Sequence, residues 1–449
     1  MKKWGYLIII IVLLIGAFFL FKPRLADMSY QKADTLYDSA KFEAAIEKFD
    51  RAIWLNSKQP AYYIGRGLTY DSLQNYENAV KDYSKAISLN KKKAIPYYFR
   101  GMTYSEMGKS QKAIEDFSSA IKYKPEMKQA YFQRGQIQSG LENYKKAIDD
   151  FSKVIKIDST LADAYFLRGG AYLELDQKQK AVDDYSKALN LGMDRMDIYE
   201  QRGKALSELE NYETAIQDYG KLIELTGGSK QLYYQRGYMK FLLERYEEAI
   251  PDFTKTLNYD KQNRDALYYR AHCYSETGNY NKAEEDFIKV TDLDPGTPKV
   301  WLNLGLAQLH LNKLSAAKSS LQEATRLNEN YAKAYFLTGM VYSKLKDHAK
   351  AISNYTRAIE NNANYAEAYN YRGLAKTEQG KHDEAIDDYT KAISIDSTYG
   401  LAYYNRGISK VSKNDFSRGC QDFYKAVDYG FKPAQKMIET YCRNHPRED

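Results

Sequence analysis

Residues 63–86 read YIGRGLTYDSLQNYENAVKDYSKA and hold small and aromatic residues at fixed distances. The spacing can be written Tyr63-x3-Gly67-x2-Tyr70, followed by Ala79-x3-Tyr83-x2-Ala86. Two small residues that face each other let two antiparallel helices approach closely, and an aromatic ring fills the space beside the contact. This stretch therefore predicts one helical hairpin.

The same spacing returns every 34 residues along most of the chain. The first small position holds Ala33, Gly67, Gly101, Gly135, Gly169, Gly203, Gly237, Ala271, Gly305, Gly339, Gly373 and Gly407. Twelve residues later, the second small position holds Ala45, Ala79, Ala113, Ala147, Ala181, Ala215, Ala249, Ala283, Ala317, Ala351, Ala385 and Gly419. The position four residues after that is aromatic in eleven repeats and is Leu321 in the other. Self-similarity at this period is the signature of stacked helical repeats, so we expect twelve hairpins around one continuous core.

This pattern resembles the tetratricopeptide repeat family over about residues 26–430. The resemblance implies an all-α fold: a right-handed superhelical solenoid of about twelve 34-residue hairpins, with the first helix of each hairpin lining a concave groove. The chain departs from the family at the proline that usually ends each repeat, which survives only as Pro125 and Pro295. With nine Pro and 26 Gly in 449 residues, the composition also leaves little material for β-hairpins or long loops.

The last residues, 431–449, are expected to form a capping helix and a short polar tail. The 34-residue step from Gly407 reaches Tyr441, so we predict a final helix over residues 433–442 that covers the apolar face of the last hairpin. Antiparallel packing would bring Cys442 near Cys420. A disulfide between them is one outcome in an oxidising compartment, and two unpaired thiols under the cap are the other.

Residues 4–21 form an uncharged apolar segment with basic residues on both sides. A helix of this length just reaches across a bilayer core, so residues 1–25 are expected to be a single transmembrane anchor. The alternative is a cleaved signal peptide of a secreted or periplasmic repeat protein, but the run ends without a small-x-small cleavage site. The basic residues favour, by a margin of one charge, a repeat domain outside the cytoplasm, in the periplasm or another extracytoplasmic space.

The 66 basic and 59 acidic residues are interspersed, and the formal net charge is +7. Binding to nucleic acid would call for a basic stripe with stacking aromatic residues, so no nucleic-acid partner is expected. The sequence holds no catalytic constellation, and His272 and His310 lack the carboxylate or Cys support of a metal site. We therefore expect a protein that is not an enzyme, with no cofactor, no metal and no small-molecule substrate.

Nine repeats carry an Arg just before the first small position and an Asp sixteen residues later. The pairs are Arg66–Asp82, Arg100–Asp116, Arg134–Asp150, Arg168–Asp184, Arg202–Asp218, Arg236–Asp252, Arg270–Asp286, Arg372–Asp388 and Arg406–Asp422. The repeats with Lys32, Leu304 or Thr338 in place of the Arg also lack the Asp. This joint occurrence predicts a charge-assisted pair that fixes the register of each hairpin. An arginine array for phosphate or carboxylate ligands is the alternative, and the matching Asp argues against it.

The resemblance places partner binding on the first helices, and we expect it in repeats seven to ten, about residues 230–345. The expected groove consists of Tyr234, Tyr238, Phe241, Tyr268, His272, Lys299, Leu302, Leu306, Leu309, Lys333, Phe336, Met340 and Lys344. An apolar groove edged by lysines suits an extended peptide or an amphipathic helix with some acidic character. The alternative is that several of these side chains belong to the core.

Together these observations predict a membrane-tethered protein–protein interaction scaffold, which binds peptide or helical segments of partner proteins in its groove. Besides the secreted or periplasmic form, the remaining alternative is a regulatory repeat subunit of an enzyme complex.

Overall fold

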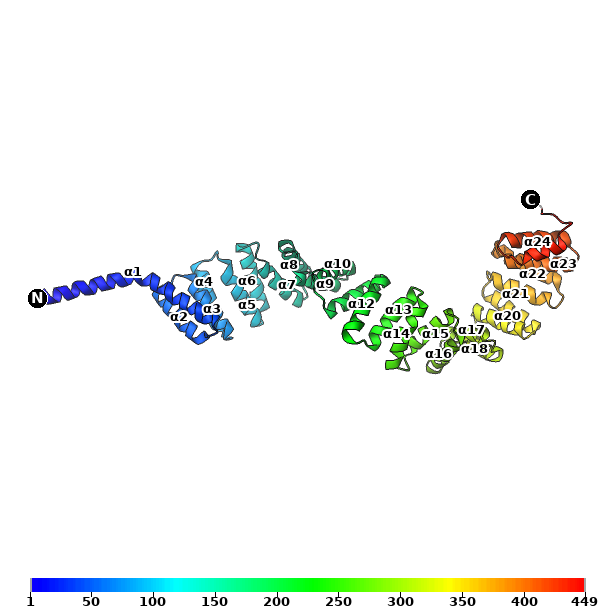
Figure 1. Cartoon of the computed structure of the whole chain (residues 1–449), viewed down its shortest axis with the longest axis horizontal. Helices are drawn as coiled ribbons and strands as arrows, with labels where there is room; N and C mark the ends of the chain where they lie inside the picture. The colour runs from blue at the N-terminus through cyan, green and yellow to red at the C-terminus, as the bar shows by residue number, and fades with distance from the viewer. Residues whose placement is uncertain (1, 448–449) are drawn as a thin grey trace. The chain divides into compact units, whose positions relative to one another are not determined.

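The structure, a computed structural model, describes residues 2–447 as 25 α-helices, with no strand in that range (Figure 1). The helices are α1 (Lys2–Asp38), α2 (Phe42–Leu55), α3 (Pro60–Ser72), α4 (Tyr76–Leu89), α5 (Ala94–Glu106), α6 (Ser110–Tyr123), α7 (Lys128–Gly140), α8 (Tyr144–Ile157), α9 (Ala162–Glu174), α10 (Lys178–Asn190), α11 (Met196–Glu208), α12 (Tyr212–Thr226), α13 (Lys230–Leu242), α14 (Tyr246–Tyr259), α15 (Arg264–Glu276), α16 (Tyr280–Leu293), α17 (Pro298–His310), α18 (Leu314–Leu327), α19 (Ala332–Lys344), α20 (His348–Asn361), α21 (Ala366–Thr377), α22 (His382–Ile395), α23 (Gly400–Ser412), α24 (Phe416–Asp428) and α25 (Ala434–Tyr441).

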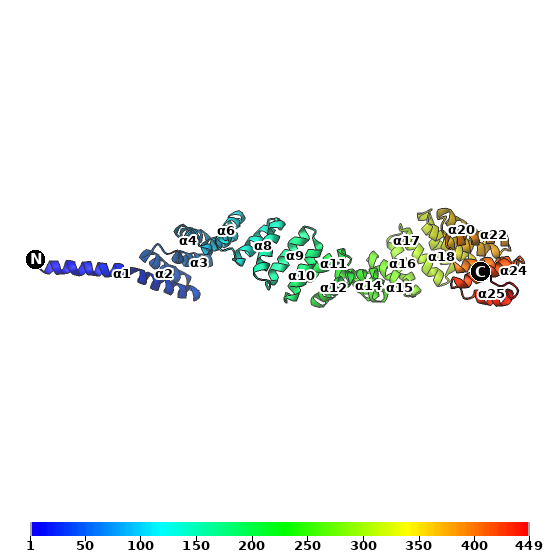
Figure 2. The same ribbon diagram turned by 90° about the horizontal axis from the view of Figure 1, so that it is seen from above.

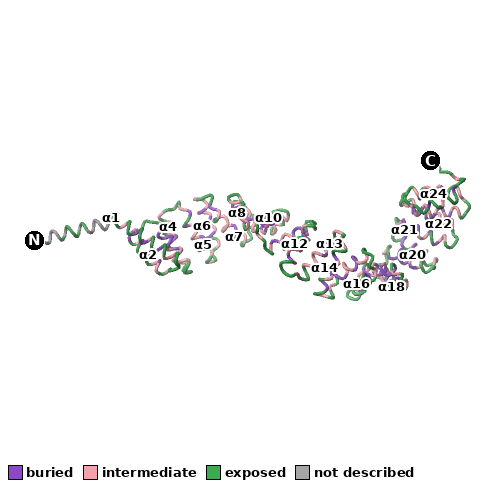
Figure 3. Tube along the Cα trace, in the orientation of Figure 1, coloured by how far each residue is buried: buried purple, intermediate pink, exposed green. Residues whose placement is uncertain are grey.

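Helices α1 to α24 form twelve consecutive hairpins, and α25 follows the last one. The prediction of an all-α helical repeat fold is therefore confirmed. The chain divides into two compact units, Met1–Asp218 and Tyr219–Asp449. Each helix packs on the next from α1 to α11 in the first unit and from α13 to α25 in the second. Buried residues recur in every hairpin instead of gathering in one centre, as expected when each repeat packs only on its neighbours (Figure 3).

The small and aromatic columns meet inside each hairpin, as predicted. A Cβ atom built on Gly67 would lie 2.7 Å from Cε1 of Tyr83, and one on Gly339 would lie 2.5 Å from Cε1 of Tyr355. Both tyrosines are fully buried. The glycines therefore let the ring of the second helix lie directly against the backbone of the first.

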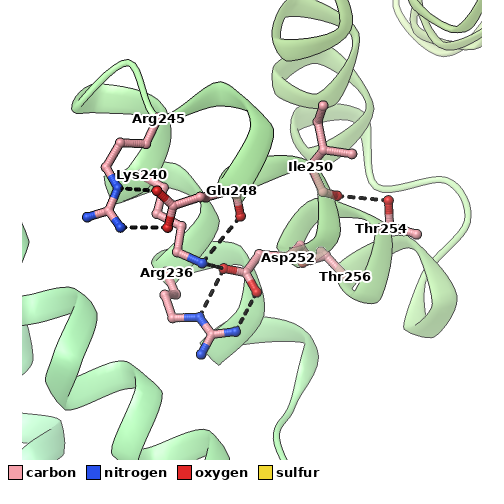
Figure 4. Close-up of polar contacts among 8 residues, drawn as sticks. All are labelled: Arg236, Lys240, Arg245, Glu248, Ile250, Asp252, Thr254 and Thr256. Carbon is pink, nitrogen blue, oxygen red and sulfur yellow. Dashed lines mark hydrogen bonds and ion pairs between the residues drawn. The ribbon is translucent and has the colours of Figure 1, made fainter. Parts of the chain in front are cut away.

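The predicted Arg–Asp pairs are confirmed in all nine repeats. Arg168, for example, donates from both Nε and Nη2 to Asp184, each at 2.7 Å, and this Asp side chain is 7% exposed. In the repeat drawn in Figure 4, Asp252 accepts the same two bonds from Arg236 and a third from Lys240 at 2.8 Å. Because every Arg is neutralised by an Asp, the column is structural and does not form an array for anionic ligands.

The same arginines also reach the preceding repeat, which the sequence pattern had not revealed. Arg168 Nη1 donates to the Ser152 hydroxyl at 3.0 Å, sixteen residues earlier on α8. The corresponding acceptors in the other repeats are Asp50, Ser84, Ser118, Ser186, Thr254, Thr356 and Thr390. Where the Arg is replaced by Leu304 or Thr338, this earlier position holds Ile288 or Gln322. Eight of the nine arginines thus hold together three helices of two adjacent repeats.

Gly220 is the one position of this acceptor column, among the nine Arg repeats, that has no side chain. A Cβ atom built there would lie 3.7 Å from Arg236 Nη1, an ordinary contact. We expect Gly220→Ser to raise the free energy of unfolding by about 1 kcal/mol, since serine favours a helix more than glycine and its hydroxyl supplies the acceptor. Chemical denaturation measures the gain. Gly220→Ala is the control: a serine variant clearly less stable than the alanine variant would contradict a role for the hydroxyl.

Helix α25, over residues 434–441, lies beside α24 (Figure 2). It buries Ala434 completely in a cluster with Phe423 and Ala426 of α24. Cys420 and Cys442 are joined by a disulfide that links α24 to the end of α25. The third cysteine, Cys273, is a free and buried thiol whose pKa is raised to about 12 by burial.

Reduction of the Cys420–Cys442 bridge is expected to destabilise the last hairpin and its cap by about 2–3 kcal/mol, because the bridge closes a loop of 22 residues. Hydrogen exchange in α24 and α25, with and without reductant, measures this loss. Thiol counting without reductant should find no reactive thiol in the folded chain and one after denaturation. Three reactive thiols after denaturation would contradict the bridge.

The predicted N-terminal membrane anchor, by contrast, is contradicted. No helix in the described part of the chain is long and apolar enough to cross a membrane. The expected anchor is not a separate helix: α1 runs through Pro23 and charged residues such as Arg24 into the first repeat, where Ala26 and Ala33 are fully buried. The prediction also rested on side chains at positions 1–6, 8, 12 and 14–19, which lie outside the described residues.

Candidate partner-binding surface

The first helices of the second unit bring five of the predicted groove residues together in one aromatic cluster. On α13, Tyr234 stacks on Tyr238, with ring centroids 6.2 Å apart, and Tyr238 stacks on Phe241 at 6.5 Å. His272 of α15 meets Phe241 edge to face at 5.2 Å and lies 6.5 Å from Tyr268. Burial, followed by nearby Asp265 and Tyr238, raises the pKa of Tyr234 to about 12. Tyr234 is therefore neutral at neutral pH.

His272 is held in its neutral form by its surroundings. Burial lowers its pKa, and the charge of Lys299 lowers it further, while Glu276 acts in the opposite direction. The Nδ1 atom is buried and has no hydrogen-bond partner among the described residues; the nearest carboxylate oxygen, on Glu276, lies 3.9 Å away. A proton on this imidazole would thus be poorly compensated.

The free energy of unfolding is expected to fall as the pH drops below about 6.5, because the unfolded chain then binds a proton that folded His272 resists. The stabilisation from neutral His272 is present above that pH and is lost as the pH falls through the lower folded pKa. Denaturation at several values between pH 7.5 and 5.5 measures the slope, and His272→Gln should make it shallower. Parallel slopes for the two proteins would contradict this role.

Three predicted groove residues belong to the core instead. Leu302, Leu309 and Phe336 are 3%, 5% and 9% exposed and lie in the apolar cluster around α17 to α21. Leu306 packs against the same cluster and is only partly exposed. These side chains face the following repeat, so they are not a surface for a partner. The exposed residues of this stretch include two lysines, Lys299 and Lys333, which form no ion pair with any described residue.

Met340 and Lys344, at the end of α19, line a pocket of about 550 Å³ that continues onto α21. Its apolar wall includes Tyr371 and Leu374. Lys346, His348 at the start of α20, and Glu378 just after α21 also line the pocket. Neither Lys344 nor Lys346 pairs with an acidic side chain of the described residues. This volume is typical of a pocket that takes one or two side chains or a small ligand.

The α21 side of the pocket lies beyond the predicted boundary at residue 345. The 34-residue step carries Met340 to Leu374, so extending the groove pattern by one more repeat would have found it. Lys346 and His348 carried no such signal, because they lie in the hairpin turn and at the start of α20, outside the first helices. Among the described residues there is no group of three or more His, Cys, Asp or Glu side chains that could hold a metal ion.

Family models described as tetratricopeptide repeat match residues 60–93, 94–127, 128–161, 162–191, 197–227, 240–286, 268–332, 332–365 and 366–399. The matches at 60–93, 94–127, 128–161, 332–365 and 366–399 each cover one 34-residue repeat of the observed hairpins. The chain belongs to the tetratricopeptide repeat family. A search of curated proteins found no match.

Several solved structures are similar to parts of this chain. The MamA protein is 31% identical over 38% of this chain and 94% of its own length, with a TM-score of 0.36. YrrB, described as a protein with an unusual peptide-binding site, is 22% identical over 42% and 97%, with a TM-score of 0.36. A protein from Parabacteroides merdae is 17% identical over 55% and 99%, with a TM-score of 0.45. Because each TM-score lies below 0.5, the family assignment rests on the repeat models.

Proposed function

We propose that this tetratricopeptide repeat protein is a protein–protein interaction scaffold whose second unit binds an acidic, partly apolar peptide segment at the α19–α21 pocket. The observation that carries the proposal is the combination of an apolar wall with unpaired lysines in one hollow. Met340 and Leu374 offer contacts to a bulky apolar side chain, and Lys344 and Lys346 offer charge to a neighbouring carboxylate.

Neighbouring features of the first-helix face support the same class of partner. The aromatic cluster of Tyr234, Tyr238, Phe241, Tyr268 and His272 presents partly exposed rings on α13 and α15. Lys299 and Lys333 add positive charge on α17 and α19. A peptide laid over such a face would bury apolar side chains on the rings and place acidic ones near the lysines.

A random nonapeptide display library, selected on the full chain, tests this proposal. We expect enriched sequences that combine Asp or Glu with Leu or Phe, and at least tenfold weaker binding of those peptides to a Lys344→Glu/Lys346→Glu variant. The matched control is Lys391→Glu/Lys425→Glu, which makes the same charge change on exposed positions of the second helices α22 and α24. Enriched peptides without acidic residues, or equal binding to both variants, would refute the proposal.

A further inference from the structure

The net charge of the chain is concentrated in one segment of the first unit. Residues 51–124 hold 13 basic and 6 acidic residues, so this segment alone accounts for the formal net charge of +7, and the rest of the chain is balanced. The segment begins near the end of α2 and runs through α6, and these helices follow one another along the first unit (Figure 1). Composition averaged over the whole chain conceals this concentration of charge.

Most of these basic residues lie at one edge of the first unit, which we call the basic edge. Successive helices of the array run in opposite directions, so the ends of α2, α4 and α6 and the turns that follow them lie on the same side. The basic edge consists of Arg51, Lys58, Lys85, Lys91, Lys92, Lys93, Lys122 and Lys124. Seven of these side chains are exposed, and Lys93 is partly exposed. None of the eight forms an ion pair with a described residue.

The acidic residues of this region do not neutralise the basic edge. On the second helices, Asp50 and Asp82 are bound to Arg66, and Asp116 is bound to Arg100. The other acidic residues of the segment lie at the opposite ends of the hairpins or in the middle of α6, and they are Asp71, Glu77, Glu106 and Glu115. The turns 56–59, 90–93 and 124–127 together hold five lysines and one carboxylate, that of Glu126.

The turn between α4 and α5 holds three consecutive lysines on a fixed backbone. The Asn90 side-chain oxygen accepts a hydrogen bond from the Lys92 N–H at 3.1 Å, and the Asn90 carbonyl accepts one from the Lys93 N–H at 3.3 Å. The Tyr97 hydroxyl donates to the Lys91 carbonyl at 3.3 Å. The backbone of the turn is thus engaged within the protein, and the three ammonium groups extend from it toward solvent.

Two bulky apolar side chains lie among these cations. Trp54, at the end of α2 between Arg51 and Lys58, is 69% exposed. The Lys22 ammonium group of α1 lies 5.6 Å from the centroid of its ring. Ile95, in the first turn of α5 directly after the three lysines, is 41% exposed. Tryptophan prefers the interface between lipid and water, and clustered lysines are attracted to anionic headgroups.

We infer that the basic edge docks on an anionic lipid surface, with its ammonium groups against headgroup phosphates and with Trp54 and Ile95 in the interfacial layer. The contact is peripheral and involves no helix that crosses the bilayer. Each lysine near an anionic surface strengthens binding about fivefold. Lysines are point charges on flexible stems, so they can follow headgroups that have no fixed positions. Charge and apolar contact are two separate attractions, and together they support reversible attachment.

The composition of the basic edge favours lipid over nucleic acid. Single strands bind by stacking bases on free aromatic faces. Tyr97 and Tyr123 instead pack on each other, with ring centroids 5.6 Å apart, and Lys22 lies over Trp54. Arginine is the residue best suited to forked contacts with a phosphate backbone, and the basic edge holds one arginine, Arg51, among seven lysines. The surface is separate from the proposed pocket on α19 and α21, so each proposal can fail without the other.

Co-sedimentation of the full chain with lipid vesicles tests the inference. One set of vesicles consists of phosphatidylcholine, and the other contains about one-third phosphatidylglycerol. The quantity compared is the ratio of the two affinities, because exposed apolar side chains of α1, such as Leu20, contribute to both. We expect a ratio of at least about ten that falls as the salt concentration rises. The ratio should fall at least about fivefold in Lys91→Glu/Lys92→Glu/Lys93→Glu.

Two further variants test the remainder of the basic edge. Lys58→Glu/Lys124→Glu changes the neighbouring turns and should lower the ratio at least about threefold. This variant keeps the test decisive if the triple variant loses helicity. Trp54→Ala should weaken binding to the anionic vesicles at least about threefold, because it removes the aromatic contact with the interfacial layer.

Two controls make the same chemical changes on the second unit. Lys255→Glu/Lys391→Glu/Lys425→Glu reverses three exposed lysines of second helices and should change the ratio less than about twofold. Tyr259→Ala removes an exposed aromatic ring at the end of α14 and is the control for Trp54→Ala.

The inference would be overturned by equal affinity for the two kinds of vesicle, or by equal ratios for the triple variant and its control. A DNA duplex or polyglutamate that binds the chain more tightly than the anionic vesicles, at equal concentration of charge, would also overturn it. The basic edge would then be assigned to that polymer instead of a lipid surface.

Discussion

Replacement of Arg168 by leucine is expected to lower the free energy of unfolding by about 3–5 kcal/mol, because it leaves a buried carboxylate without its partner. Asp184 is 7% exposed in its side chain and loses two hydrogen bonds of 2.7 Å. Ser152 on the preceding repeat loses its bond to the same guanidinium. Since a repeat array can unfold locally, amide hydrogen exchange in α8, α9 and α10 should accompany chemical denaturation.

A double-mutant cycle separates the pair from the general cost of each change. Asp184→Leu added to Arg168→Leu should recover part of the loss, with a coupling of about 2 kcal/mol. Arg195 and Asp197 are the matched control: they also form a two-bond pair in the same unit, but their side chains are 49% and 41% exposed. Their coupling is expected to be below about 1 kcal/mol. Strict additivity at Arg168 and Asp184 would show that the buried pair has no structural role.

The sequence predicted the hairpins and the Arg–Asp pairs because both depend on contacts within one 34-residue unit. A small residue and a large apolar one recur at the positions of Gly67 and Tyr83 in every repeat because the helix contact requires both. The Arg and Asp columns disappear together for the same kind of reason. The acceptor that lies sixteen residues before each arginine was not predicted, because it belongs to the preceding repeat. Ser, Thr or Asp at this position can each accept the hydrogen bond that the arginine donates, so the position does not form a uniform column.

The partner-binding surface was predictable only in part, because a repeat pattern does not state which side of the first helix the next repeat covers. Leu302 and Phe336 share a column with Tyr234 and Tyr268, yet the two former are buried and the two latter partly exposed. The hydropathy of residues 4–21 likewise showed that the segment is apolar, but it did not reveal that helix α1 continues into the first repeat.

Replacement of Gly135 by leucine is expected to lower the free energy of unfolding by about 3 kcal/mol or more, because the first and second helices of that hairpin are in direct contact there. A Cβ atom at Gly135 would lie 2.9 Å from Cε1 of Phe151 and 3.2 Å from Cβ of Asp150. Phe151 is fully buried and cannot move aside into solvent. Any shift of α8 would also strain the bonds from Arg134 to Asp150, at 2.7 and 2.9 Å.

Leucine is the informative substitution at this position, because Ala271 occupies the same column in another repeat and is accommodated there. The same change at Gly140, the last residue of the same helix, is the control, since a Cβ atom there would meet no atom within 4 Å. Gly140→Leu should leave the stability unchanged or raise it by up to about 1 kcal/mol, as expected for replacing glycine in a helix. Both variants place a leucine on the same helix, so they differ only in whether the new side chain meets the second helix of the hairpin. Similar denaturation midpoints for both would mean that the glycine column does not set the distance between the helices.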